Sequence, residues 1–199
     1  MMVDPDGSEL TAYYSARGKY ITTIDDGNDG AKMLVVKKMS LNDAIQSNAV
    51  IPLPSEEVLS MMDSAYAMTE ENGKEHGFQV DVNGNVGDMG EGDEGSIKIP
   101  TVYSKTGEYV DYDVHTHPLL ECDSNSSYDS NANSSDADRS GYVGNHPNVV
   151  LGYKGDYGVQ TRMIGFYHKS GDIGDRDYYS FKKSVRKAQR DWQIRTNSN

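Results

Sequence analysis

Apolar residues recur at helical spacing in two segments of the chain. One is SEEVLSMMDSAYAMTEENG, residues 55–73, which starts at Ser55 and ends at Gly73, and the other runs from Tyr178 to Arg195. Ser before the first apolar position and Gly after the last are typical caps of an α-helix. The pattern therefore predicts two amphipathic helices, and Ser40 followed by Asp43 predicts the start of a shorter one.

Other segments alternate apolar and polar residues with a period of two, as half-buried strands do. A strand is expected to start at Glu75, because Phe78 and Val80 alternate with polar neighbours. Turn-forming residues between further strand-like runs predict three β-hairpins. The hairpins pair residues 20–24 with 32–37, residues 96–103 with 108–116, and residues 148–154 with 159–169.

This order of elements predicts an α+β fold, with a mixed β-sheet flanked by helices. The 199 residues suffice for one domain of moderate size. Residues 1–39 begin with a turn-rich cluster and hold only the first hairpin, so we expect them to be an N-terminal remnant of a larger carrier. Residues 40–199 would then form the main domain.

Charge and composition narrow the classes of partner. The formal net charge is −12 and the pI is about 4.7, which speaks against binding of nucleic acid phosphates. No apolar run approaches the roughly 20 residues of a membrane-spanning helix, and the N-terminus lacks the pattern of a signal peptide. The single cysteine, Cys122, excludes an intrachain disulfide and is expected to be an incidental loop thiol. The basic residues of the C-terminal helix either face solvent or meet the protein's own acidic surface.

The tetrapeptide HTHP, residues 115–118, carries the most specific chemistry in the chain. His115 and His117 lie two residues apart at the end of a predicted strand, so both side chains point to the same face. Two imidazoles placed in this way form a pair of metal ligands. A catalytic zinc ion usually takes three protein ligands and keeps one open position, so one more ligand is required.

Candidates for that ligand lie downstream in two SxxD patterns. One pattern is Ser135 to Asp138, which sits in a segment typical of a helix start. The other is Ser126 to Asp129, which lies closer to HTHP. We prefer Asp138 as the ligand. If Asp129 were the ligand, Asp138 would lie in a long irregular connection. Upstream, Glu75 is the candidate general base.

The order Glu75, HTHP, Ser135, Asp138 resembles the signature of the JAB/MPN (JAMM) metallopeptidase family, over about residues 55–169. The stretch between HTHP and Ser135 is longer than is common in that family, and the spacing of Ser126 to Asp129 fits it better. The resemblance implies a JAB/MPN-like fold with cytidine-deaminase-like layering. It also implies that His115, His117 and Asp138 hold a zinc ion and that the protein cleaves a protein or peptide substrate.

The resemblance gives two further residues a part in the reaction. Glu75 would take a proton from water and return it to the leaving amine, and Ser135 would donate a hydrogen bond to the developing oxyanion. Thr116, between the two histidines, should face the opposite side of the strand. Asp111 or Asp113 would orient a ligand imidazole, and His146 or His168 would be a substitute ligand if the acidic loop takes no part.

Residues 4–7, DPDG, resemble the sequence that closes the RHS-repeat core of bacterial polymorphic toxins. That resemblance implies a C-terminal toxin domain, secreted or delivered as an effector within a larger chain, with an immunity protein as a partner. Two other functions remain open. One is an inactive MPN-like binding or scaffold module, and the other is a different HxH metal enzyme such as a phosphoesterase.

Overall fold

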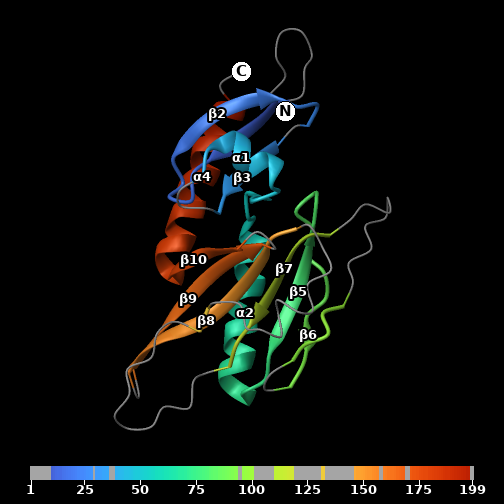
Figure 1. Ribbon diagram of the computed structural model, residues 1–199, viewed down its shortest axis with the longest axis vertical. Coiled ribbons are helices and arrows are strands. Elements are labelled where there is room, and N and C mark those ends of the chain that lie inside the picture. Colours follow the sequence, from blue (N-terminus) through green and yellow to red (C-terminus); the bar gives the residue numbers. More distant parts are fainter. Residues whose placement is uncertain are drawn as a thin grey trace.

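The chain forms an α+β fold with two mixed β-sheets and a few helices, which confirms the expected fold class (Figure 1). The computed structural model describes residues 10–28, 30–35, 39–93, 96–100, 110–118, 131–132, 146–156, 159–168 and 171–197.

The larger sheet has six strands in the order β10-β9-β8-β7-β5-β6. Its neighbours pair antiparallel, except that β7 and β8 run parallel. The strand bounds are β5 (His76–Asp81), β6 (Gly90–Glu91), β7 (Val110–Thr116), β8 (Asn148–Asp156), β9 (Val159–His168) and β10 (Gly171–Asp177). The central position of β7 places the HTHP segment in the middle of the sheet.

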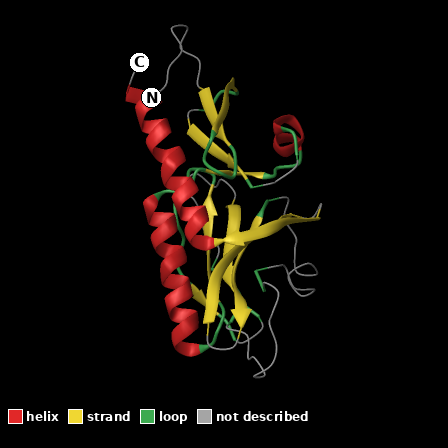
Figure 2. Ribbon diagram, turned by 90° about the vertical axis from the view of Figure 1, so that its left-hand side faces the viewer, coloured by secondary structure: helices red, strands yellow, loops and turns green. Residues whose placement is uncertain are grey.

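Two long helices cover one face of this sheet (Figure 2). Helix α2 (Glu56–Asn72) packs on β5 and β7, and helix α4 (Tyr178–Asn197) packs on β9 and β10. The Ser55 hydroxyl accepts a hydrogen bond from the backbone N–H of Val58, and Gly73 ends α2 in the left-handed conformation. These are the caps that the sequence predicts. The buried core between helices and sheet comprises Val58, Met62, Tyr66, Phe78, Val114, Leu151, Ile164, Phe166, Phe181 and Val185, among others.

A second sheet is built from the N-terminal part of the chain, in the order β2-β1-β3-β4. Its strands are β1 (Leu10–Tyr14), β2 (Tyr20–Asp25), β3 (Gly30–Leu34) and β4 (Val50–Pro52), and the short helix α1 (Leu41–Gln46) lies beside it. Ala12 and Tyr14 belong to the main core, whereas Tyr13 and Leu34 pack with Ala44 of α1. The sheet therefore has two buried faces.

The N-terminal sheet is joined to the C-terminal half of α4. The Tyr14 hydroxyl donates to the carboxylate of Asp191 at 3.1 Å, and the Arg195 guanidinium lies 3.5 Å from the ring centre of Tyr20. The half-buried side chain of Arg176, just before α4, donates to the carbonyl of Ala16 at 2.6 Å. The two sheets thus share the last helix as a common support.

Helix α4 also meets the acidic face of α2. The ammonium of Lys182 lies 2.8 Å from a carboxylate oxygen of Asp63, and Arg186 lies 3.0 Å from Glu56. Two of the basic residues of α4 therefore meet the protein's own acidic surface, as one of the two interpretations of that stretch holds. Both pairs are accessible to solvent, which screens their charges, so they orient the two helices more than they stabilise the fold.

The expected hairpin of residues 20–24 with 32–37 is wrong, although its strands exist. Strand β1 lies between β2 and β3, paired antiparallel with β2 and parallel with β3. This arrangement buries Tyr14 and Ala12 in the core, which a two-stranded hairpin could not do. Residues 36–38 lie outside the described residues.

The expected pairing of residues 96–103 with 108–116 is not observed either. Residues 96–100 form no strand, residues 101–109 lie outside the described residues, and the partners of β7 are β5 and β8. The hairpin of β8 with β9 is confirmed. Strand β10, whose sequence GDIGDRD is mostly polar, was not expected.

The N-terminal sheet continues beyond the expected domain boundary at residues 39 and 40, because β3 pairs with β4. No helix among the described residues is both long and apolar enough to cross a membrane.

Replacing Gly18 tests how the N-terminal sheet is docked. Gly18 has a φ of +67°, and an added Cβ would overlap the backbone carbonyl of Ser184 in α4. Gly27 has a similar φ of +72° and nothing within 4 Å of such a Cβ. We expect Gly27→Ala to cost about 1 kcal/mol in the free energy of unfolding, from backbone strain alone. Gly18→Ala should cost at least about 1–3 kcal/mol more, because the helix must shift.

Urea denaturation monitored by circular dichroism measures both costs. Equal losses for the two variants would contradict close packing of this turn against α4.

Candidate metal centre

Strand β7 presents its side chains alternately to the two faces of the large sheet. Tyr112, Val114 and Thr116 point into the core beneath the helices, and all three are fully buried. Asp111, Asp113 and His115 therefore lie on the opposite face. His117 follows directly after the strand, and its backbone N–H donates to the carbonyl of Leu151 in β8 at 2.8 Å. The expected orientations of His115 and Thr116 are confirmed.

The two histidine side chains approach each other through their Nε2 atoms, which lie 3.3 Å apart. The ring centres are 5.2 Å apart and the ring planes are inclined by 53°. Two nitrogen ligands of a tetrahedral zinc ion, each 2.0–2.1 Å from the metal, are about 3.3–3.4 Å apart. The observed separation therefore fits a pair of nitrogens that bind one zinc ion.

The other ring nitrogen of His117 fixes the tautomer of that side chain. Nδ1 lies 2.7 Å from the backbone carbonyl of Asn131. A carbonyl oxygen can only accept, so Nδ1 carries the proton and donates it. In the neutral imidazole, Nε2 then holds the lone pair that a metal ion requires.

Asn131 is held in place by hydrogen bonds to Tyr153 of β8 and to Pro118, and by its close approach to the sheet at Gly152. Its backbone N–H donates to the carbonyl of Tyr153 at 3.0 Å, and its side chain accepts from the N–H of Tyr153 and donates to the carbonyl of Pro118. An added Cβ at Gly152 would meet Asn131, and one at Gly165 would overlap the carbonyl of Ala132. Because Gly152 of β8 and Gly165 of β9 have no Cβ, residues 131 and 132 can pack closely against the sheet.

Thr116, between the two histidines, fastens the end of β7 from the opposite face. Its hydroxyl accepts from the backbone N–H of His76 at 2.8 Å and lies 2.6 Å from the hydroxyl of Thr69 in α2. The His76 ring lies 3.1 Å from the same Thr69 hydroxyl. All three side chains are fully buried. This network fixes β5, β7 and α2 relative to one another directly below the histidine pair.

Glu75 lies beside the histidine pair by strand register. Strand β5 begins at His76, one residue after the expected start, and Gly77 pairs with His115. Continuing this antiparallel register sets Glu75 opposite His117. Because His76 points towards α2, its neighbour Glu75 belongs to the face of the histidine pair. Glu75 is 6% exposed, so its carboxylate is largely withdrawn from bulk water.

The third ligand cannot be located within the described residues. There, no group of three or more His, Cys, Asp or Glu side chains is arranged to hold a metal ion. Ser135 and Asp138, the alternative pair Ser126 and Asp129, and Cys122 all lie outside the described residues. His115 and His117 are thus the part of the expected site that the structure brings together.

Three other expected candidates, His146, Asp113 and Asp111, lie away from the histidine pair. His146 bonds through Nε2 to the carboxylate of Asp113 at 2.9 Å, rather than joining the histidine pair. Asp113 therefore orients His146. The Asp111 Oδ2 atom has no hydrogen-bond partner among the described residues. The side chain of His168 lies outside the described residues.

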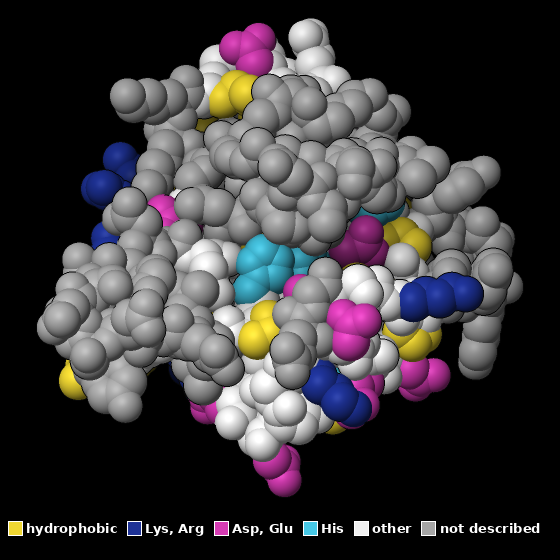
Figure 3. Space-filling model, turned by 60° about the horizontal axis from the view of Figure 1, so that its bottom comes forward, with side chains coloured by type: hydrophobic (Ala, Val, Ile, Leu, Met, Phe, Trp, Pro, Cys, Tyr) yellow, Lys and Arg dark blue, Asp and Glu magenta, His cyan; other side chains and the backbone are white. Residues whose placement is uncertain are grey.

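Histidine side chains are visible on one face of the molecule, with carboxylate side chains close by (Figure 3). Two imidazoles beside a largely buried carboxylate can hold a divalent cation and move a proton next to it. Asn131 is the functional residue that the sequence did not single out. The signal for it was the pair of glycines inside apolar strands, Gly152 and Gly165, which marks a close approach of another segment.

Replacing Thr116 by Val should lower the free energy of unfolding by about 1–3 kcal/mol, because the buried N–H of His76 loses its acceptor. Thr116→Ser keeps the hydroxyl and should cost about 1 kcal/mol or less, from the lost methyl group. Chemical denaturation of both variants measures the difference. A Val variant as stable as the Ser variant would show that the network does not hold the strand ends together.

Comparison with known proteins gives no relative to set beside this geometry. No protein-family model matches the chain, and neither curated protein sequences nor solved structures yield a match.

Proposed function

We propose that the chain is a zinc-dependent metallopeptidase of JAB/MPN type, which hydrolyses a peptide or isopeptide bond. The observation that carries the proposal is the Nε2 to Nε2 separation of 3.3 Å between His115 and His117. The contact of His117 Nδ1 with the Asn131 carbonyl supports it, because it leaves Nε2 free of its proton. Asp138 is the proposed third ligand, with Asp129 as the alternative.

Zinc bound there would supply a Lewis acid that polarises a carbonyl and lowers the pKa of water. Glu75 accepts the proton of the attacking water and delivers it to the leaving amine. Its burial beside the histidine pair supports this role, because the carboxylate is largely shielded from bulk water. Ser135 donates a hydrogen bond to the oxyanion of the tetrahedral intermediate.

A JAB/MPN-like layering is part of the same proposal. Support comes from α2 directly preceding Glu75, and from a sheet that carries the histidines on the face opposite the helices. From the DPDG sequence we further propose a toxin domain, delivered as an effector within a larger chain and neutralised by an immunity protein.

Metal analysis of the purified protein tests the first step. We expect about one zinc ion per chain, and its loss in both His115→Ala and His117→Ala. His146→Ala is the matched control and should retain zinc, because His146 bonds Asp113. Zinc retained in both variants of the histidine pair would end the proposal. Asp138→Ala and Asp129→Ala then decide which carboxylate is the third ligand.

Activity on a peptide library tests the role of Glu75. Glu75→Gln should retain zinc and lose about 10²- to 10⁴-fold in rate, because the proton carrier is removed. The fold should persist, since the ladder bonds of Glu75 to Gly92 and Asp93 are made by its backbone. Glu71→Gln, at an exposed position of α2, is the control. A chain that binds zinc but has no activity before substitution is instead a binding module, and two metal ions per chain would favour a phosphoesterase.

A further inference from the structure

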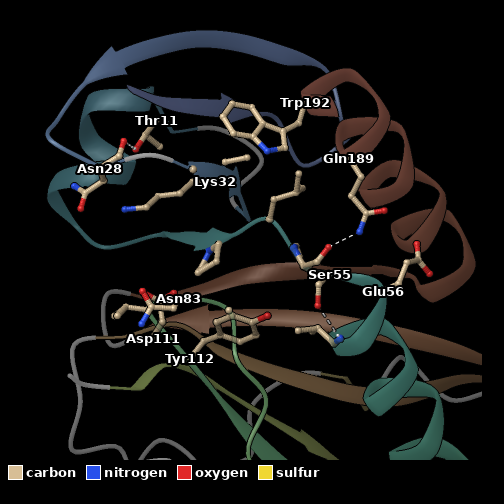
Figure 4. A pocket seen from close by; sticks show the side chains of 18 of the residues that line it. Thr11, Asn28, Lys32, Ser55, Glu56, Asn83, Asp111, Tyr112, Gln189 and Trp192 are labelled. Atoms are coloured by element: carbon tan, nitrogen blue, oxygen red, sulfur yellow. Dashed lines mark hydrogen bonds between the residues drawn. The ribbon is translucent and has the colours of Figure 1, made fainter. Parts of the chain in front are cut away.

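A cavity of about 1030 Å³ lies between the N-terminal sheet and the start of β7, far from the histidine pair (Figure 4). Its walls come from β1, β3, residues 52–56, the turn at residues 82–84, β7 and α4. Its volume is at the upper end of the range for small-molecule sites, about 300–1,000 Å³. From Asp111 to His117 the strand rises about 20 Å, so this cavity is a separate site.

Two residues that line the cavity each carry a buried polar atom that lacks a partner among the described residues. These atoms are Oδ2 of Asp111 and the hydroxyl oxygen of Tyr112. Tyr112 is fully buried. Buried polar atoms in folded proteins are nearly always hydrogen-bonded, so both atoms point to a missing partner. For a carboxylate oxygen, that partner must be a hydrogen-bond donor.

Lys32 supplies an opposite charge in the same cavity. It reaches in from β3, and within the described part of the chain it has no carboxylate within ion-pair distance (Figure 4). Burial raises the pKa of Asp111 to about 6, while the charges of Lys32 and His146 lower it and that of Asp81 raises it. Two carboxylates line the cavity, and Glu56 is paired with Arg186. Among the described residues, Asp111 and Lys32 are the oppositely charged lining groups that no direct ion pair neutralises.

An apolar surface faces these charges. The indole of Trp192 lies at the top of the cavity in Figure 4, and Leu53, Pro54 and Val58 contribute aliphatic surface. Trp192 is the partly buried last member of the apolar face of α4. A ligand that satisfies all parts of this cavity carries a cation, an anion and an apolar group.

We propose that this cavity binds a short peptide with free ends, its ammonium group on Asp111, its carboxylate on Lys32, and an apolar side chain against Trp192. A phosphate-rich ligand fits less well, because Asp111 would repel it and Lys32 alone would balance it. A neutral sugar would leave both charges unpaired. The proposal is independent of the metal centre, since it uses none of its residues.

The sequence contains one tryptophan, so the intrinsic fluorescence of Trp192 reports on this cavity alone. The experiment titrates the full chain with the dipeptide Leu-Leu and follows the emission of Trp192. We expect a saturable change with Leu-Leu. Binding should weaken about 10- to 100-fold with N-acetyl-Leu-Leu and with Leu-Leu amide, because each lacks one charge.

Two variants assign the charges to the residues. Asp111→Asn should bind Leu-Leu about as weakly as the wild type binds N-acetyl-Leu-Leu, and Lys32→Met as weakly as the wild type binds Leu-Leu amide. Asp88→Asn and Lys183→Met, at exposed positions, are matched controls and should bind like the wild type. Absence of saturation at millimolar Leu-Leu, or equal binding of the blocked dipeptides, overturns the proposal. The blocked dipeptides need no variant, so the test holds even if a substitution disturbs folding.

Discussion

The alternation of side chains along β7 is the constraint on which the core and both candidate sites depend. Its inward residues Tyr112 and Val114 fill the space beneath α2, and Thr116 is buried on the same side. The residues between them must therefore point to the opposite face of the sheet, and they include His115 and Asp111. A shift of one residue in the pairing with β5 would bury the charged set and expose the apolar set. The strand register is thus protected by the cost of burying charge.

The same constraint explains how strongly the histidine pair is oriented. His115 is fixed by the ladders on both sides of β7, and His117 by the backbone of β8 and the carbonyl of Asn131. Each support comes from a different part of the chain. Side chains held in this way have little conformational freedom left to lose, which lowers the cost of ordering when a ligand binds.

Patterns among neighbouring residues predicted the elements that are stabilised by contacts between neighbouring residues. The caps of α2 at Ser55 and Gly73, the apolar face of α4 and the hairpin of β8 with β9 were all readable from neighbouring residues. Strand pairing across distance was not. Nothing in the residues of β1 indicates that it separates β2 from β3, because the gain comes from burying Tyr14 against elements far along the chain.

The residues of the candidate site likewise differ in whether the sequence pattern could predict their positions. The period of a strand sufficed to place His115 and His117 on one face, and the antiparallel register then sets Glu75 next to them. Asn131 could not be found by periodicity, since its position depends on a segment returning over Gly152 and Gly165. Residue types identify ligands, whereas the carbonyl that orients a ligand can belong to any residue.

The contact between the first strand and the last helix has a consequence for folding. Tyr14 and Asp191 are 177 positions apart, so the N-terminal sheet acquires this support only after α4 has been made. Contacts between distant residues slow folding, because the chain must lose the entropy of a large loop before the contact forms. During synthesis, β1 and β2 must therefore wait for α4 before their contacts with this helix can form.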